Sequence, residues 1–183
     1  MFVATRLSPQ EVDQIKASNI QKVTALKQHA APLSRAALDL AQTARDMKAH
    51  AESLKTSGQT KLVGEHGQQV STKQLIQSLK SAKDALKSFS GKAENLSREL
   101  NFFDNHQQGL YVGNVAMVPL ADKVRWCQQQ VVGLQKQSRK LCDQQRPLVQ
   151  KAISDIQHAA PFLGRSIQTS LANQITALAG EAN

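Results

Sequence analysis

Apolar residues recur along this chain at alternating steps of three and four, the spacing of one face of a long helix. Ser8-Pro9-Gln10-Glu11 precedes the first series and matches a capping box with proline at the first helical position. These features predict a helix over about residues 9–57, kinked at Pro32 because proline removes a backbone donor. The series alternates small and large side chains: Val23, Leu26, Ala30, Leu33, Ala37, Leu40, Ala44, Met47, Ala51 and Leu54.

Two further series have the same spacing. The second consists of Leu75, Leu79, Ala82, Leu86, Phe89, Ala93, Leu96, Leu100 and Phe103, and the cap residues Ser71-Thr72-Lys73-Gln74 precede it. It predicts a helix over 72–104. The third consists of Leu120, Val124, Cys127, Val131, Leu134, Ser138, Leu141, Gln145, Leu148 and Ala152, including two polar core positions. We expect Ser138 and Gln145 to fix helix register rather than to carry chemistry.

The spacing changes phase after Ala152, and a last apolar series runs to Leu178. Its members are Ile156, Ala160, Leu163, Ile167, Leu171, Gln174 or Ile175, and Leu178. Pro147 and Pro161 are two places where the chain can bend. We therefore predict two helices in this region, over 119–146 and 147–180.

Two connectors, residues 58–71 and 105–118, separate the predicted helices. In the first, Lys61-Leu62-Val63 and Gln69-Val70 flank a glycine-containing turn, a pattern typical of a β-hairpin. In the second, Leu110-Tyr111-Val112 and residues 115–118 flank Gly113-Asn114, a two-residue turn that favours a hairpin. We expect both connectors to form short hairpins at the ends of a helical bundle.

Together these elements predict an all-α fold. The expected architecture is an elongated antiparallel helical bundle or coiled coil of three to four long helices, with short β-hairpin connectors and one domain over residues 1–183. A hydrophobic content of 40% and a charged content of 20% are typical of globular proteins. Because heptads also support oligomers, a second copy of the chain is an alternative way to complete the bundle.

The chain carries a net charge of +9, which favours acidic partners, but its basic residues are spread over the whole length. Lys73, Lys80 and Lys87 recur every seven residues, and Arg125, Arg139 and Arg146 fall at multiples of seven, so each set forms a line along a helix. The favoured interpretation is a solvated bundle face. The alternative is a surface for phosphates or lipid headgroups, although no aromatic residues alternate with the lines to support base stacking.

Motifs for catalysis and cofactor binding are absent from the sequence. The five histidines and two cysteines match no zinc-site spacing, and Gly64-Glu65-His66-Gly67 lacks the Lys-Ser/Thr of a phosphate-binding loop. Asp104 and His106 suit the turn that ends a helix. We therefore expect a non-enzymatic protein with no cofactor, no metal and no small-molecule substrate.

The expected compartment is reducing. Cys127 and Cys142 lie roughly 22 Å apart along one predicted helix, too far for an internal disulfide. The first residues lack a signal-peptide pattern, and no apolar run reaches the roughly 18 residues of a membrane helix. These features predict a cytoplasmic protein, or one exported without a conventional cleavable signal peptide. The glutamine content and the lack of disulfide pairing favour a bacterial intracellular or secretion-system-associated protein.

Four of the seven aromatic residues gather where the second predicted helix ends and the third begins: Phe102, Phe103, Tyr111 and Trp126. One interpretation is a small core that closes the end of the bundle. The other is a partner-binding surface formed by Phe102, Tyr111 and Trp126. We accordingly predict a protein–protein interaction module, such as an adaptor, scaffold or secreted effector, with another protein as its partner. The alternative is a basic helical surface that binds anionic membrane or nucleic acid.

Overall fold

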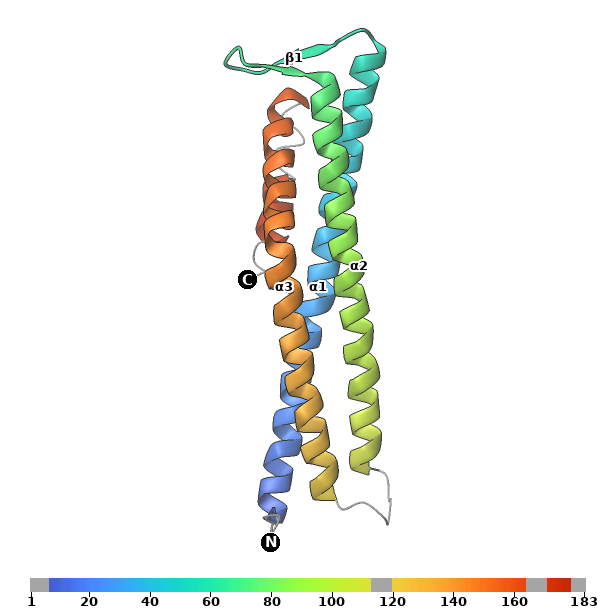
Figure 1. Ribbon diagram of the computed structural model, residues 1–183, viewed down its shortest axis with the longest axis vertical. Helices are drawn as coiled ribbons and strands as arrows, with labels where there is room; N and C mark the ends of the chain where they lie inside the picture. The colour runs from blue at the N-terminus through green and yellow to red at the C-terminus, as the bar shows by residue number, and fades with distance from the viewer. Residues whose placement is uncertain (1–6, 113–119, 164–170, 179–183) are drawn as a thin grey trace. The chain divides into compact units, whose positions relative to one another are not determined.

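The structure is a computed structural model that describes residues 7–112, 120–163 and 171–178, and it confirms the all-α fold class (Figure 1). Three long helices alternate in direction, and a small hairpin lies between the first two. A further helical segment covers residues 171–178. The elements are α1 (Pro9–Thr56), β1 (Lys61–Val63), β2 (Gln69–Ser71), α2 (Thr72–Val112) and α3 (Leu120–Leu163).

The chain divides into two compact units, and each long helix contributes to both. The first unit comprises Met1–Ala31 and Glu94–Leu141, and the second comprises Pro32–Ala93 and Cys142–Asn183. The division in α1 therefore falls at Pro32, the position where the sequence predicts a kink. Helical geometry continues through this proline, whose side chain is exposed. The single-domain organisation and the kink itself stay predictions.

Local sequence signals set the ends of α1. The Ser8 hydroxyl accepts a hydrogen bond from the Glu11 backbone N–H at 3.1 Å, as predicted from the capping box. At the other end, Gly58 has a φ of +92°, and the Gln59 N–H donates to the Leu54 carbonyl at 3.0 Å. This is a Schellman ending, in which glycine supplies the left-handed conformation that other residues rarely adopt.

The first predicted hairpin is confirmed. Strands β1 and β2 are antiparallel, with Leu62 opposite Val70, and Gly67 turns the chain with a φ of +78°. Leu62 is buried, and the Thr72 hydroxyl at the start of α2 donates to the Gln59 carbonyl at 2.7 Å. The hairpin is thereby anchored to the helix that follows it.

The first two apolar series form the core on α1 and α2, as predicted. Every member of the second series is buried, and in the first series only Leu26 and Leu54 are partly exposed. In the first unit, Val12 and Val23 of α1 pack with Phe103, Tyr111, Val124, Cys127 and Val131. In the second unit, Ala37, Ala44 and Ala51 of α1 are fully buried. Small residues at these positions allow close helix packing.

Helix α2 corrects the prediction that residues 105–118 form a connector. The helix continues to Val112, so the expected strand Leu110-Tyr111-Val112 is wrong; residues 113–119 lie outside the described part. The physical reason is that Gln107 and Tyr111 extend the buried face of α2 beyond Phe103. Gln107 is polar, and it therefore broke the apolar pattern without ending the helix.

Helix α3 corrects the boundary predicted at residues 146 and 147. It runs without interruption through Pro147 and Pro161, whose side chains are both exposed. The carbonyl group that each proline leaves without a helical donor belongs to an exposed residue, Asp143 or Gln157, where water can satisfy it. Of the helix predicted over 147–180, residues 147–163 belong to α3 and residues 171–178 to the short segment.

The third apolar series changes phase earlier than predicted. Ser138 and Gln145 are buried as expected, but Leu148 is 50% exposed and Val149 takes the next core position. Leu120, the first member, is also exposed. The buried residues are Gln145, Val149, Ala152 and Ile156. The step from Gln145 to Val149 is four residues where the predicted series has three, and the longer step keeps the buried side of α3 facing the core.

This change of phase predicts opposite outcomes for two neighbouring substitutions. Val149→Ala should lower the free energy of unfolding by about 1–3 kcal/mol because it removes two buried methyl groups. Leu148→Ala removes more atoms but should change it by less than about 0.5 kcal/mol because the side chain faces solvent. Urea denaturation of both variants measures the difference. A larger loss of stability from Leu148→Ala than from Val149→Ala would instead place Leu148 in the core, as the predicted spacing does.

Candidate functional site

Four aromatic side chains of the first unit form a continuous cluster from its core to its surface. We call Phe102, Phe103, His106 and Trp126 the aromatic cluster. The Phe103 ring is buried, and its centroid lies 6.4 Å from that of Trp126. Trp126 meets His106 edge to face at 5.7 Å, and His106 lies parallel to Phe102 at 6.5 Å. The cluster therefore connects the packed core to exposed rings.

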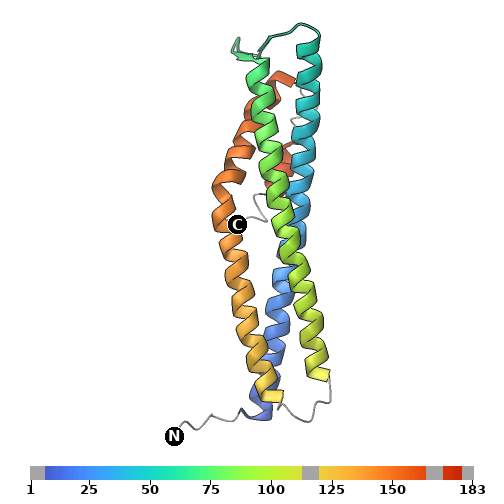
Figure 2. The ribbon, with the colours of Figure 1, turned by 45° about the vertical axis from the view of Figure 1, so that its right-hand side comes forward.

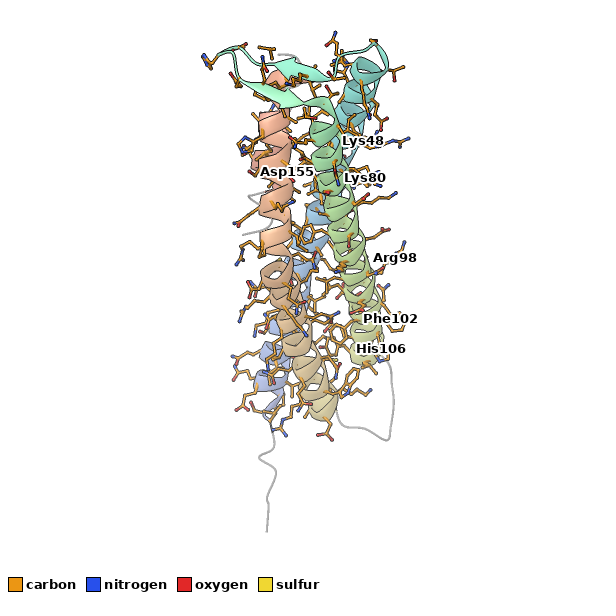
Figure 3. All side chains as sticks on the ribbon, turned by 45° about the horizontal axis from the view of Figure 1, so that its top comes forward. Lys48, Lys80, Arg98, Phe102, His106 and Asp155 are labelled. Atoms are coloured by element: carbon orange, nitrogen blue, oxygen red, sulfur yellow. The ribbon has the colours of Figure 1, made fainter. Side chains whose placement is uncertain are left out.

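Helical geometry explains why the cluster reaches the surface. Phe102 precedes the core residue Phe103 by one position, so it points away from the core, and His106 follows one turn later on the same side of α2 (Figure 3). Trp126 on α3 likewise precedes the buried Cys127. Phe102 is 77% exposed and Trp126 is 43% exposed. A continuous group of exposed rings is more informative than a single exposed apolar residue.

Tyr111 takes a different place: it is buried and belongs to a polar network inside the same unit. Its hydroxyl donates to Gln107 Oε1 at 3.0 Å and accepts from Asn19 Nδ2 at 3.0 Å. Asn19 also donates to the Val124 carbonyl at 3.1 Å. Asn19 lies on α1, Tyr111 and Gln107 on α2, and Val124 on α3, so these bonds join all three helices.

Asp104 ends this network with three hydrogen bonds. Gln107 Nε2 donates to Oδ1 at 3.0 Å, while Lys27 Nζ and Gln108 Nε2 donate to Oδ2 at 3.1 Å and 3.3 Å. Burial alone would raise the pKa of Asp104, but the hydrogen bonds from Gln107 and Lys27 and the charge of Lys27 together lower it below its ordinary value of 3.8. Asp104 is therefore a buried, paired carboxylate and does not end the helix.

Tyr111 and Cys127 share the apolar surroundings of the network. Burial raises the pKa of Tyr111 far above its ordinary range, and burial also raises the pKa of the Cys127 thiol. The Lys16 ammonium lies 5.5 Å from the centre of the Tyr111 ring, within the range of a cation–π contact. The Tyr111 hydroxyl and the Cys127 thiol therefore stay protonated at neutral pH.

The structure thus divides the three partner-binding candidates. Phe102 and Trp126 are on the exposed side of the aromatic cluster, whereas Tyr111, at 9% exposure, lies inside the unit with its hydroxyl in the polar network. The prediction that His106 ends a helix is wrong, since α2 continues to Val112. Its place in the aromatic cluster was not predicted, and neither were the buried residues Asn19 and Gln107. The sequence shows that His106 lies one turn from Phe102 and that Gln107 lies one turn from Tyr111. Asn19 could not be found in this way, because it is 92 residues from its partner Tyr111.

The two lines of basic residues also differ. Lys73, Lys80 and Lys87 are all exposed on the part of α2 in the second unit. Among the arginines, Arg139 is exposed, Arg125 is half-buried, and Arg146 pairs with Asp143 at 3.2 Å. The lysine line remains an available cationic surface, while the arginine line is partly committed to contacts within the chain.

Other kinds of site receive no support from the described residues. Among them, no three histidine, cysteine, aspartate or glutamate side chains are grouped so as to hold a metal ion. No helix in the described ranges has the length and apolar character required to span a membrane. Comparison of the chain with known protein families, with curated protein sequences and with solved structures finds no match.

Removing the tyrosine hydroxyl tests the buried network. Tyr111→Phe keeps the ring but leaves Gln107 Oε1 and one Asn19 donor without their partner. We expect a loss of about 1–3 kcal/mol in the free energy of unfolding, the cost of unsatisfied buried polar groups. Urea denaturation followed by circular dichroism measures it. An unchanged stability would show that the hydroxyl is not required.

Asp104 gives the network a pH dependence with a defined sign. Because its pKa is lower in the folded than in the unfolded protein, its ionisation stabilises the fold above pH 3.8 and this contribution is lost as the pH falls through the folded pKa. At pH 7, Asp104→Asn should cost about 1.5–3 kcal/mol through its charge-assisted hydrogen bonds. The difference in the free energy of unfolding between Asp104→Asn and wild type should become smaller at acidic pH.

The measurement is the urea midpoint at several pH values from acid to neutral. Asp84→Asn is the matched control, since Asp84 is exposed and lies 3.6 Å from Lys83 in a surface ion pair. It should change stability by less than about 0.5 kcal/mol at any pH. A constant difference between Asp104→Asn and wild type across the series would contradict the assignment.

Proposed function

We propose that this protein is a non-enzymatic protein–protein interaction module and that the exposed side of the aromatic cluster contacts its partner. The single observation that supports the proposal is the exposure of Phe102, whose ring adjoins His106 and, through it, the half-exposed Trp126. Aromatic side chains, tryptophan above all, dominate the binding energy of protein interfaces. An adaptor, a scaffold or a secreted effector would each use such a surface.

The surroundings of the cluster suit an interface anchor. Trp126 contacts the buried Phe103 ring, and Tyr111 and Gln107 of the polar network lie on the same part of α2 as Phe102, Phe103 and His106. Rings held in this way lose little conformational freedom on binding, which lowers the entropic cost of association. The support beneath the rings therefore favours binding as well as stability.

Polar residues of the first unit, on the same two helices as the aromatic cluster, resemble an interface rim. Glu99 on α2 accepts a hydrogen bond from Gln137 on α3 at 2.8 Å, and Arg98 pairs with Glu94 at 2.9 Å. Leu120 and Val132 add exposed apolar surface in the same unit. An apolar centre with a polar periphery is the arrangement found in non-obligate protein complexes.

The second candidate function is binding of anionic membrane or nucleic acid, and the exposed lysine line of α2 supports it. Lys73, Lys80 and Lys87 share one side of the helix, and Lys80 projects from α2 in Figure 3. Phosphate contacts of this kind give an affinity that falls steeply with salt. This candidate uses the second unit, whereas the aromatic cluster belongs to the first.

Substitution of Phe102 tests the proposed contact surface. Proteins captured by the wild-type chain from cells of its source are identified by quantitative mass spectrometry and compared with those captured by Phe102→Ala. A direct partner should be lost with Phe102→Ala, and the purified complex should weaken by about 30-fold, the effect of a strong interface residue. The free energy of unfolding should stay within about 0.5 kcal/mol of wild type, since the ring is exposed.

Leu38→Ala is the matched control, because Leu38 is another exposed large apolar residue and lies in the second unit. It should retain every partner that Phe102→Ala loses. If Phe102→Ala and Leu38→Ala capture the same partners in equal amounts, the exposed side of the aromatic cluster is not the contact surface. Binding to anionic vesicles or nucleic acid that disappears on reversing the charge of Lys80 and Lys87 would favour the second candidate instead. Light scattering identifies the case in which the partner is a second copy.

A further inference from the structure

The second unit contains a cavity of about 480 Å³ beside the hairpin, a volume in the range of ligand-binding pockets. It lies among strand β2, the first turns of α2 and the last turns of α3. Val70, Leu75, Pro161 and Phe162 provide its apolar lining, and glutamine side chains, Ser78 and Asp155 provide much of its polar lining. None of these residues belongs to the aromatic cluster, so the cavity is a separate feature.

Strand β2 offers backbone hydrogen-bonding groups on the side away from β1. The Gly64 N–H bonds the Gln68 carbonyl at 2.7 Å, and the Thr72 N–H bonds the Thr60 carbonyl at 3.0 Å, so hydrogen-bonded pairs fall at even-numbered positions. Lys61, Val63, Gln69 and Ser71 form the alternate pairs, whose N–H and C=O groups point outward in an antiparallel ladder. The sheet of the described residues has two strands, so neither edge is paired.

Three of these outward groups are on β2. Gln69 contributes both its N–H and its C=O, whereas Ser71 contributes its N–H because its carbonyl accepts the first hydrogen bond of α2. Gln69 and the next residue, Val70, also line the cavity. An edge that carries unpaired donors and acceptors beside a cavity matches the requirements for adding an extended peptide as a third strand.

The chemistry of the cavity defines what the peptide would place in it. The glutamine amides can donate or accept, as the peptide backbone requires, and the apolar residues provide a surface for one apolar side chain. Asp155 is the one carboxylate in the lining, and Lys151 pairs with it at 3.5 Å (Asp155 is labelled in Figure 3). The cavity is thus close to neutral overall, which disfavours a charged side chain.

From these observations we propose that β2 and the adjacent cavity bind an extended segment of another protein, which pairs with Gln69 and Ser71 and inserts a neutral apolar side chain between Leu75 and Phe162. The hairpin is then a binding edge and not only a connector. Figure 2 shows the hairpin from a second direction, next to the start of α2. This inference does not depend on the aromatic cluster, which belongs to the first unit.

A library of linear random peptides displayed on phage is a suitable probe, selected on the full chain. We expect enriched sequences that share an apolar residue within an uncharged segment and bind saturably. When one synthetic enriched peptide is bound, hydrogen exchange should become slower at the Gln69 and Ser71 amides. The exchange rates of the Lys61 and Val63 amides should not change. No enrichment, or protection confined to α2 or α3, would overturn the proposal.

Two proline variants separate the edges of the hairpin. Gln69→Pro removes an outward N–H of β2, and Val63→Pro removes the equivalent outward N–H of β1, so neither deletes a bond between the strands. Gln69→Pro should weaken the peptide by about tenfold or more, the effect of one lost hydrogen bond of about 1.4 kcal/mol. Val63→Pro should bind as wild type does. Equal affinities for the two variants would rule out pairing with β2.

Filling the cavity provides a second test that leaves the strand intact. Ser78 lines the cavity and Ser81, one turn later on α2, is exposed outside it. Ser78→Phe should abolish peptide binding, and Ser81→Phe should preserve it. Phe102→Ala should also preserve it, so failure of this inference and failure of the proposed function give different results. Peptide binding by Ser78→Phe at wild-type strength would show that the cavity takes no part.

Discussion

Burial of the alternating small and large side chains of the long helices is the interaction on which every other feature depends. In the second unit, Ala37, Ala44 and Ala51 are fully buried, as are the larger Leu40, Leu79 and Phe89. Each helix alone would expose this apolar surface, and packing removes it from water at about 25 cal/mol per Å². Helix positions that do not face the core can therefore form exposed surface, as the rings of Phe102 and Trp126 do.

The first unit combines this apolar packing with a polar network. Asn19, Gln107 and Tyr111 satisfy one another, and no buried side-chain nitrogen or oxygen of the described residues lacks a hydrogen-bond partner. A satisfied network costs little and allows few alternative registers, because a shifted helix would leave several groups unpaired. The exposed rings of Phe102 and Trp126 are consequently presented by helices whose register is well defined.

Much of the fold was predictable because it follows from short-range spacing. The first two apolar series, the Ser8 cap and the hairpin of residues 61–71 are each encoded within a few residues. The errors arose where a residue departs from its average behaviour. Gln107 is polar but buried, Leu148 is apolar but exposed, and Pro147 lies within a helix because it faces solvent. The gathering of the aromatics was predictable, but their division into Phe102 outside and Tyr111 inside was not.

The sequence by itself determined the apolar faces of α1 and of α2 as far as Phe103, the hairpin and the region where aromatic residues gather, since periodicity and turn residues act locally. Tertiary structure alone decided which polar residues are buried, because a buried polar group is stable only beside a partner such as Asn19, which lies 92 residues from Tyr111. It also decided that β2 adjoins a cavity, since that cavity is lined by α2 and by α3, far along the chain.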